Sequence, residues 1–173
     1  MPPTLTLPGF VNAHSHTFQR ALRGRAAGGD FWAWREGMLA EAAAATPDSV
    51  FAAYQAAYAE MRAAGYTAVG EFHYLGVAEA KAAAEAAARA GLEFVLLHVA
   101  YARGGLERMR QASVADFLVE VEELASEGIA VGVAPHSVRA CPIEWLRESG
   151  RYADRQRLAP EFTETAISQT TPR

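Results

Sequence analysis

Short apolar runs alternate with longer helix-like stretches along most of the chain. Runs rich in β-branched and aromatic residues predict strands over 7–16, 66–74, 92–101 and 129–134. The stretches between them predict helices over 31–44, 47–64, 77–90, 114–125 and 142–157. Thr46 and Ser113 can cap a helix start, and Gly65 and Gly91 can end a helix. Strands separated by helices imply parallel βα units, in either a (β/α) barrel or a doubly wound sheet.

Polar side chains follow the ends of these strands, and their placement favours the barrel. They are His14 and His16, then His73 and Tyr74, then Tyr101, and finally His136 and Arg139. Chemistry at the carboxyl ends of successive strands is typical of a TIM-type barrel. No glycine-rich phosphate loop follows the first strand, which disfavours a nucleotide-binding sheet. A complete barrel takes about 250 residues, so the sequence predicts an α/β fold that is a partial (β/α)₈ TIM-type barrel of about four βα units.

The first strand ends in a His-x-His motif. Residues i and i+2 of a strand share a face and lie about 6.6 Å apart, so His14 and His16 can converge on one cation. Catalytic zinc takes about three protein ligands, so other residues must complete such a site. The alternative is a structural pair, and the polar run that follows the motif at once counts against it.

Arginines form the second group of candidates, because a guanidinium can hold a carboxylate through two parallel hydrogen bonds. Arg35 lies on an aromatic-rich helix, and Arg139 follows His136 in a loop, where polar residues often bind ligands. Two such arginines near one metal would suit a dicarboxylate; as an alternative, they are solvated surface charges. His98 is expected to be structural, and both a core and a functional role remain open for His73.

Composition narrows the class of protein. A net charge of −4 and a pI near 5.7 give no general attraction to nucleic acid or to anionic membranes. The single Cys141 cannot form an internal disulfide, which fits a reducing, cytoplasmic setting, and a packed, inert thiol is its expected role. No signal peptide is recognisable, and no stretch reaches the roughly 20 apolar residues of a membrane span.

The stretch around the histidine motif resembles a known family. Residues 8–16 resemble the first strand of the amidohydrolase superfamily, whose His-x-His binds the catalytic metal. Further stretches are similar, in order, to the formimidoylglutamate deiminases of that superfamily: 14–21, 31–36, 64–74 and 136–140. The resemblance covers roughly residues 5–157.

The resemblance implies a metal-dependent hydrolase that converts N-formimidoyl-L-glutamate to N-formyl-L-glutamate and ammonia in histidine degradation. It implies that His14 and His16 are ligands of zinc or another divalent metal. Positions that contact the small dicarboxylate substrate in the family are matched by Gln19, Arg35, Tyr74, His136 and Arg139.

The chain also departs from the family. The fifth strand with its metal-binding histidine, the catalytic glutamate and the late metal-binding aspartate are not found, so no catalytic proton shuttle is assigned. We expect a truncated barrel domain over 1–157 and a polar tail over 158–173. Two alternatives stay open: a non-catalytic fragment that self-associates through the open edges of its first and fourth strands, and a deaminase of another amidine or a heterocycle.

Overall fold

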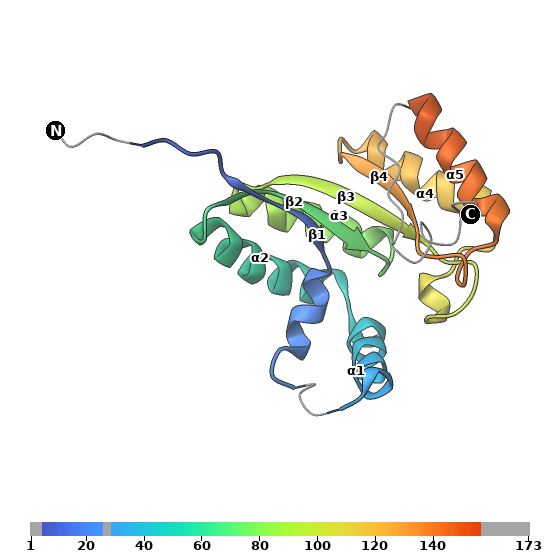
Figure 1. Cartoon of the computed structure of the whole chain (residues 1–173), viewed down its shortest axis with the longest axis horizontal. Helices are drawn as coiled ribbons and strands as arrows, with labels where there is room; N and C mark the ends of the chain where they lie inside the picture. The colour runs from blue at the N-terminus through green and yellow to red at the C-terminus, as the bar shows by residue number, and fades with distance from the viewer. Residues whose placement is uncertain (1–4, 26–28, 157–173) are drawn as a thin grey trace, which may run out of the picture.

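The computed structural model describes residues 5–25 and 29–156. One parallel sheet runs in the order β1-β2-β3-β4 (Figure 1). Its strands are β1 (Phe10–Ser15), β2 (Tyr66–His73), β3 (Glu93–Ala100) and β4 (Val131–Pro135). The α-helices are α1 (Phe31–Ala44), α2 (Pro47–Ala63), α3 (Val77–Ala90), α4 (Val114–Ser126) and α5 (Ile143–Gln156). Short 3₁₀ helices are η1 (Thr17–Leu22) and η2 (Glu107–Met109).

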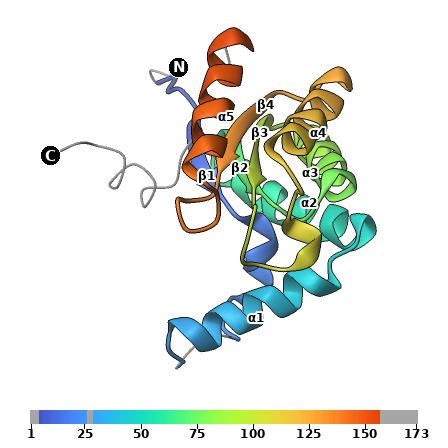
Figure 2. The same cartoon turned by 90° about the vertical axis from the view of Figure 1, so that its right-hand side faces the viewer.

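Strand order confirms the predicted architecture. Each strand pairs with the next strand along the chain, as in the wall of a (β/α) barrel. In a doubly wound sheet the order of the strands reverses near the centre, so that strands distant in sequence become neighbours. Helices α2, α3 and α4 lie along one side of the sheet, and α1 stands apart from it (Figure 2). The 3₁₀ helix η1 packs against both α1 and α2. The fold is therefore a partial (β/α) barrel of four parallel strands.

Local sequence signals set the helix ends. The Thr46 hydroxyl accepts from the Ser49 N–H (3.2 Å), and the Ser113 hydroxyl accepts from the Asp116 N–H (3.1 Å), as expected of N-caps. Gly91 ends α3 with a φ of 70°, a backbone conformation that residues with a Cβ rarely adopt. Both 3₁₀ helices were absent from the sequence prediction, because such short turns leave little periodicity in the sequence.

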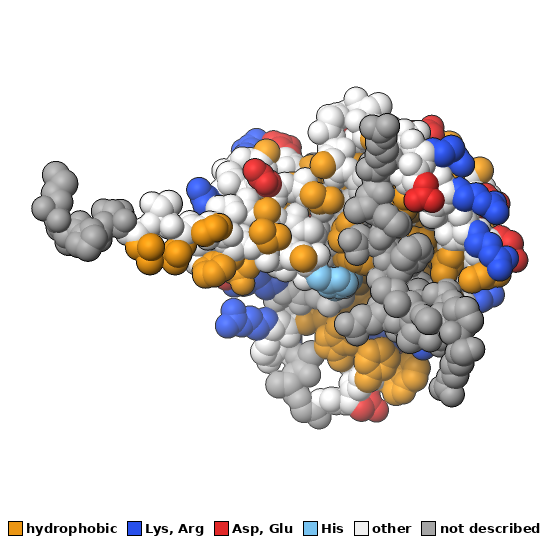
Figure 3. All heavy atoms as spheres, turned by 45° about the horizontal axis from the view of Figure 1, so that its top comes forward, with side chains coloured by type: hydrophobic (Ala, Val, Ile, Leu, Met, Phe, Trp, Pro, Cys, Tyr) orange, Lys and Arg blue, Asp and Glu red, His pale blue; other side chains and the backbone are white. Residues whose placement is uncertain are grey.

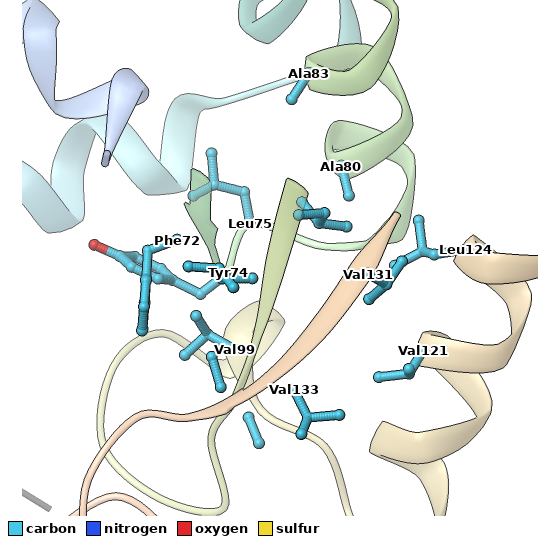
Figure 4. Packing of buried hydrophobic residues seen from close by; sticks show 14 of the residues in the cluster. Phe72, Tyr74, Leu75, Ala80, Ala83, Val99, Val121, Leu124, Val131 and Val133 are labelled. Atoms are coloured by element: carbon cyan, nitrogen blue, oxygen red, sulfur yellow. The ribbon is translucent and has the colours of Figure 1, made fainter. Parts of the chain in front are cut away.

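The core lies between the sheet and its helices. Alanines of α3 pack directly on the sheet, and Ala80 and Ala83 are fully buried (Figure 4). In the same view, Val121 and Leu124 of α4 point toward β4, where Val131 is nearly buried. Small side chains on α3 let the helix approach the strands closely, so a larger residue there would need the helix to move.

Strands β1 and β4 form the edges of the sheet in the part of the chain that the structure describes. Phe10 and Val11 of β1 are 62% and 65% exposed, and hydrophobic side chains gather along this segment in Figure 3. The expected first strand began at residue 7, but pairing starts where the Phe10 N–H donates to the Gly65 carbonyl (3.0 Å). Self-association through these edges stays a prediction.

Two expectations concern regions beyond these elements. The proposed tail over 158–173 lies outside the described residues, as do residues 1–4, 26–28 and 157. Among the helices in the described ranges, none is both long enough and apolar enough to cross a membrane.

Candidate metal and substrate site

The two histidines of the His-x-His motif converge at the end of β1. Their Nε2 atoms lie 3.0 Å apart. Two nitrogens bound to one tetrahedral zinc at roughly 2.0 Å would be about 3.3 Å apart. The pair is therefore already close to the spacing that a shared zinc ion requires, and His14 and His16 fit such an ion.

Strand β2 orients both imidazoles. The His16 Nδ1 lies 3.2 Å from the Phe72 carbonyl oxygen, and the His14 ring stacks on the Phe72 ring at a centroid distance of 4.5 Å. Because a carbonyl oxygen can only accept, the Nδ1 of His16 must carry the proton. The Nε2 of a neutral His16 is then the acceptor, and His14 donates to it through its own Nε2. This tautomer of His16 presents an unprotonated Nε2, as a metal ligand must.

Burial keeps the relevant imidazoles neutral. Desolvation, followed by the neighbouring His14, lowers the pKa of His16 to about 4. Desolvation and the nearby Arg139 guanidinium lower the pKa of His136 to about 4 as well. Both rings are therefore uncharged at neutral pH, which is the protonation state that can coordinate a metal or accept a proton from a substrate.

A cavity of about 830 Å³ opens beside His16. The predicted site residues that line it come from separate segments of the chain: His16, Gln19, Arg35, Tyr74, His136 and Arg139. His14 is not part of the lining, but it contacts His16. His16, Tyr74 and His136 meet there because each follows the carboxyl end of a parallel strand, and those ends share an edge of the sheet. The η1 and α1 helices bring Gln19 and Arg35 to the same cavity.

Polar side chains in the cavity are fixed by contacts with one another. The Gln19 amide donates to the Tyr74 hydroxyl (2.8 Å). Burial raises the pKa of Tyr74 well above its usual range, so the hydroxyl keeps its proton and can donate to a ligand. The Tyr101 ring stacks on His136 at a centroid distance of 4.5 Å, which sets the plane of that imidazole.

Comparison with known proteins identifies the family. The Amidohydrolase family profile matches residues 5–159. The chain belongs to this family. It is 35% identical to a formimidoylglutamate deiminase of Pseudomonas aeruginosa over 78% of its own length, and 30% identical to a 5-methylthioadenosine/S-adenosylhomocysteine deaminase of Haloarcula marismortui over 83%. These alignments cover only 36% and 33% of the two relatives, so the chain spans about a third of their length.

A solved structure supports the same fold for this amidohydrolase. The mutant atrazine chlorohydrolase TrzN of Arthrobacter aurescens, complexed with zinc and atraton, superposes with a TM-score of 0.81. The match covers 90% of this chain and 40% of that protein, at 19% identity. The likeness concerns the fold, and the four-stranded sheet described above corresponds to part of that enzyme's barrel.

Positive charge dominates the amidohydrolase cavity. Three guanidinium groups line it, those of Arg35, Arg103 and Arg139, and no aspartate or glutamate does so among residues 5–25 and 29–156. Arg35 forms a 3.2 Å ion pair with the exposed Glu36, a surface pair of little strength. The electrostatic field of a cavity with this charge attracts anions.

Some cavity residues were not anticipated from the sequence. The Arg103 Nε donates to the Arg139 carbonyl (2.6 Å) and its terminal nitrogen to the Val138 carbonyl (3.1 Å), so Arg103 holds the loop that carries His136 and Arg139. Nothing near Arg103 in the sequence signals this contact. Trp34 also lines the cavity, and its place next to Arg35 on an aromatic-rich helix was the available signal.

The remaining histidines and the cysteine are core residues. The His98 Nε2 lies 2.8 Å from the Glu120 carboxylate, and the His73 Nε2 lies 3.3 Å from the Gly76 carbonyl, both with buried rings. Cys141 is buried, and burial raises the pKa of its thiol. Within the described ranges no group of three or more His, Cys, Asp or Glu side chains could hold a metal, so a site at His14 and His16 needs further ligands from outside such a group.

Proposed function

We propose that this chain provides the metal-binding strand and a substrate pocket of a hydrolase that converts N-formimidoyl-L-glutamate to N-formyl-L-glutamate and ammonia. One observation carries the proposal: the paired imidazoles lie beside a cavity that Arg35 and Arg139 line and that no described acidic residue enters. The substrate has two carboxylates for these arginines and one amidine carbon to present to the metal. The 35% identity to a formimidoylglutamate deiminase supports the same substrate.

The residues of this chain would bind and orient the substrate. Arg35 and Arg139 would each hold a carboxylate through paired hydrogen bonds, and a substrate carboxylate would replace the exposed Glu36 at Arg35. The Tyr74 hydroxyl, fixed by Gln19, would donate to a substrate oxygen or nitrogen. The neutral His136 could accept a proton from the substrate or donate its own ring N–H.

His14 and His16, together with further ligands, would hold zinc, and the bound ion would activate the attacking water. Strand β2 contributes through the Phe72 carbonyl, which accepts the His16 Nδ1–H and so keeps Nε2 unprotonated and able to coordinate. The aromatic side chains of α1 line one side of the cavity.

The test is ammonia release from N-formimidoyl-L-glutamate, together with calorimetric binding of the product N-formyl-L-glutamate. We expect Arg139→Ala to weaken product binding by at least about tenfold, since it leaves a carboxylate without its cation. Arg89→Ala is the matched control, because Arg89 pairs with Glu85 on the surface of α3. Failure of the unsubstituted protein both to bind the product and to release ammonia contradicts the proposal.

A second candidate is deamination of a heterocycle. It is favoured by the wall of Trp32 and Trp34 in the cavity, since aromatic side chains stack on flat bases, and by the 30% identity to a 5-methylthioadenosine/S-adenosylhomocysteine deaminase. In the same assay, release of ammonia from 5-methylthioadenosine that survives Arg139→Ala would favour this candidate over the dicarboxylate.

A further inference from the structure

The backbone ladder between β1 and β2 becomes irregular at the histidine motif. Asn12 pairs with Val69, and the next pair is Ser15 with Glu71, so one strand advances farther than the other between them. The motif therefore lies where regular strand pairing does not fix the backbone. Another interaction must hold residues 15–17 if the two imidazoles are to keep their spacing.

The side chain of Glu71 supplies that interaction. It is fully buried, and its carboxylate accepts from the Thr17 N–H (2.7 Å), the Thr17 hydroxyl (2.6 Å) and the Tyr58 hydroxyl (3.1 Å). The Ser15 and Thr17 hydroxyls are 2.9 Å apart. Because the single proton of the Thr17 hydroxyl goes to Glu71, Ser15 is the donor of that bond. Both residues that flank His16 are thereby tied to one carboxylate.

The residue next to Glu71 contacts the imidazoles themselves. The Phe72 carbonyl accepts from His16, and the Phe72 ring stacks on His14. Two consecutive residues of β2 therefore hold the motif. Glu71 holds the residues on either side of His16, and Phe72 contacts the two imidazole rings.

We propose that Glu71 is a positioning residue for the metal site: its buried carboxylate holds residues 15–17 so that the His16 Nδ1–H donates to the Phe72 carbonyl and its Nε2 points toward His14. The inference deepens the proposed function, because it assigns to this chain the group that prepares the metal-ligand pair. It does not depend on the identity of the substrate.

The chemistry of the position supports a role beyond packing. A fully buried carboxylate is costly, and burial raises the pKa of Glu71 while hydrogen bonds from Thr17 oppose that rise. An apolar residue between β2 and α2 would avoid this cost. It could not accept the Thr17 N–H, and the motif would lose its link to β2.

The experiment measures the tautomer of His16 by ¹⁵N NMR of the histidine rings at neutral pH, without metal. We expect the unsubstituted protein to show His16 with its proton on Nδ1. Glu71→Leu should give a mixture of the two tautomers, and Glu71→Gln, which can still accept the Thr17 N–H, should restore most of the original state. Tyr58→Phe is the control, because it removes one donor to the same carboxylate and leaves both bonds from Thr17 to Glu71 in place.

Thr17→Val provides a second variant should Glu71→Leu not fold, and it should shift the tautomer in the same direction by a smaller amount. Zinc competition against a chromophoric chelator gives a second readout, in which Glu71→Leu should weaken binding by about 10- to 100-fold. A folded Glu71→Leu with an unchanged His16 tautomer overturns the inference, as does an equal shift in Tyr58→Phe. Absence of zinc binding by the unsubstituted protein would contradict the proposed metal chemistry, while the NMR result would still decide the role of Glu71.

Discussion

The Arg108 guanidinium of η2 donates to the Glu79 carboxylate of α3 at 2.5 Å. The same side chain donates to the carbonyls of Ala42 and Ala45 at the end of α1 (3.3 and 2.7 Å) and to that of Leu75 before α3 (2.9 Å). Arg108 therefore fixes the base of α1, the helix that carries Arg35 and the aromatic wall of the cavity.

The first prediction follows from this contact. Arg108→Ala should lower the free energy of unfolding by roughly 2–4 kcal/mol, because it leaves the nearly buried Glu79 carboxylate and several carbonyls without a donor. Urea denaturation followed by circular dichroism measures the change. Arg89→Ala, which removes an exposed pair with Glu85 and a contact over the Phe51 ring, should cost about 1 kcal/mol. Equal losses in the two variants would show that Arg108 is an ordinary surface residue.

A second prediction concerns pH. Burial, followed by the neighbouring His98, lowers the pKa of His73 to about 3, below its value of about 6.5 in an unfolded chain. The unfolded state therefore binds more protons below pH 6.5, and stability is lost as the pH falls from about 6.5 toward 3, by at most about 1.4 kcal/mol per pH unit for this group.

Replacing His73 tests this linkage. His73→Gln removes the titrating ring and retains a donor for the Gly76 carbonyl. Between pH 6.5 and 4, the slope of the unfolding free energy against pH should therefore decrease by the amount that corresponds to the uptake of about one proton on unfolding. His16 and His136, whose pKa values are also lowered, should account for part of the remaining slope. The measurement is urea denaturation across this pH range; an unchanged slope in the variant would contradict the assignment.

The third prediction concerns Arg103, which both lines the cavity and holds the loop that carries Arg139. Arg103→Ala should weaken binding of N-formyl-L-glutamate by about tenfold, because the loop carrying Arg139 loses both side-chain anchors from Arg103. Arg110→Ala, an exposed substitution on the same connection, is the control. Calorimetric titration measures both variants, and equal affinities would mean that backbone contacts alone hold the loop.

The sequence predicted those features of the fold and the site that depend on residues close together along the chain. The caps at Thr46 and Ser113, the order of strands and helices, and the clustering of His16, Tyr74 and His136 at strand ends all follow from local signals and from the geometry of parallel strands. What it did not predict depends on contacts between distant residues. Glu71 meets Thr17 across 54 positions, and neither residue belongs to a recognisable motif for such a bond.

Zinc provides the last prediction. Zinc should raise the thermal midpoint of the unsubstituted chain, since a ligand that binds only the folded state stabilises it by about 2.7 kcal/mol at 100 times its Kd. His14→Gln should lose this response yet keep the midpoint measured without metal, because the His14 ring is exposed and its removal leaves no cavity in the core. Magnesium is the control cation, since it prefers oxygen ligands to imidazole. Equal stabilisation of both proteins by zinc would place the ion elsewhere and remove the basis for assigning His14 as a ligand.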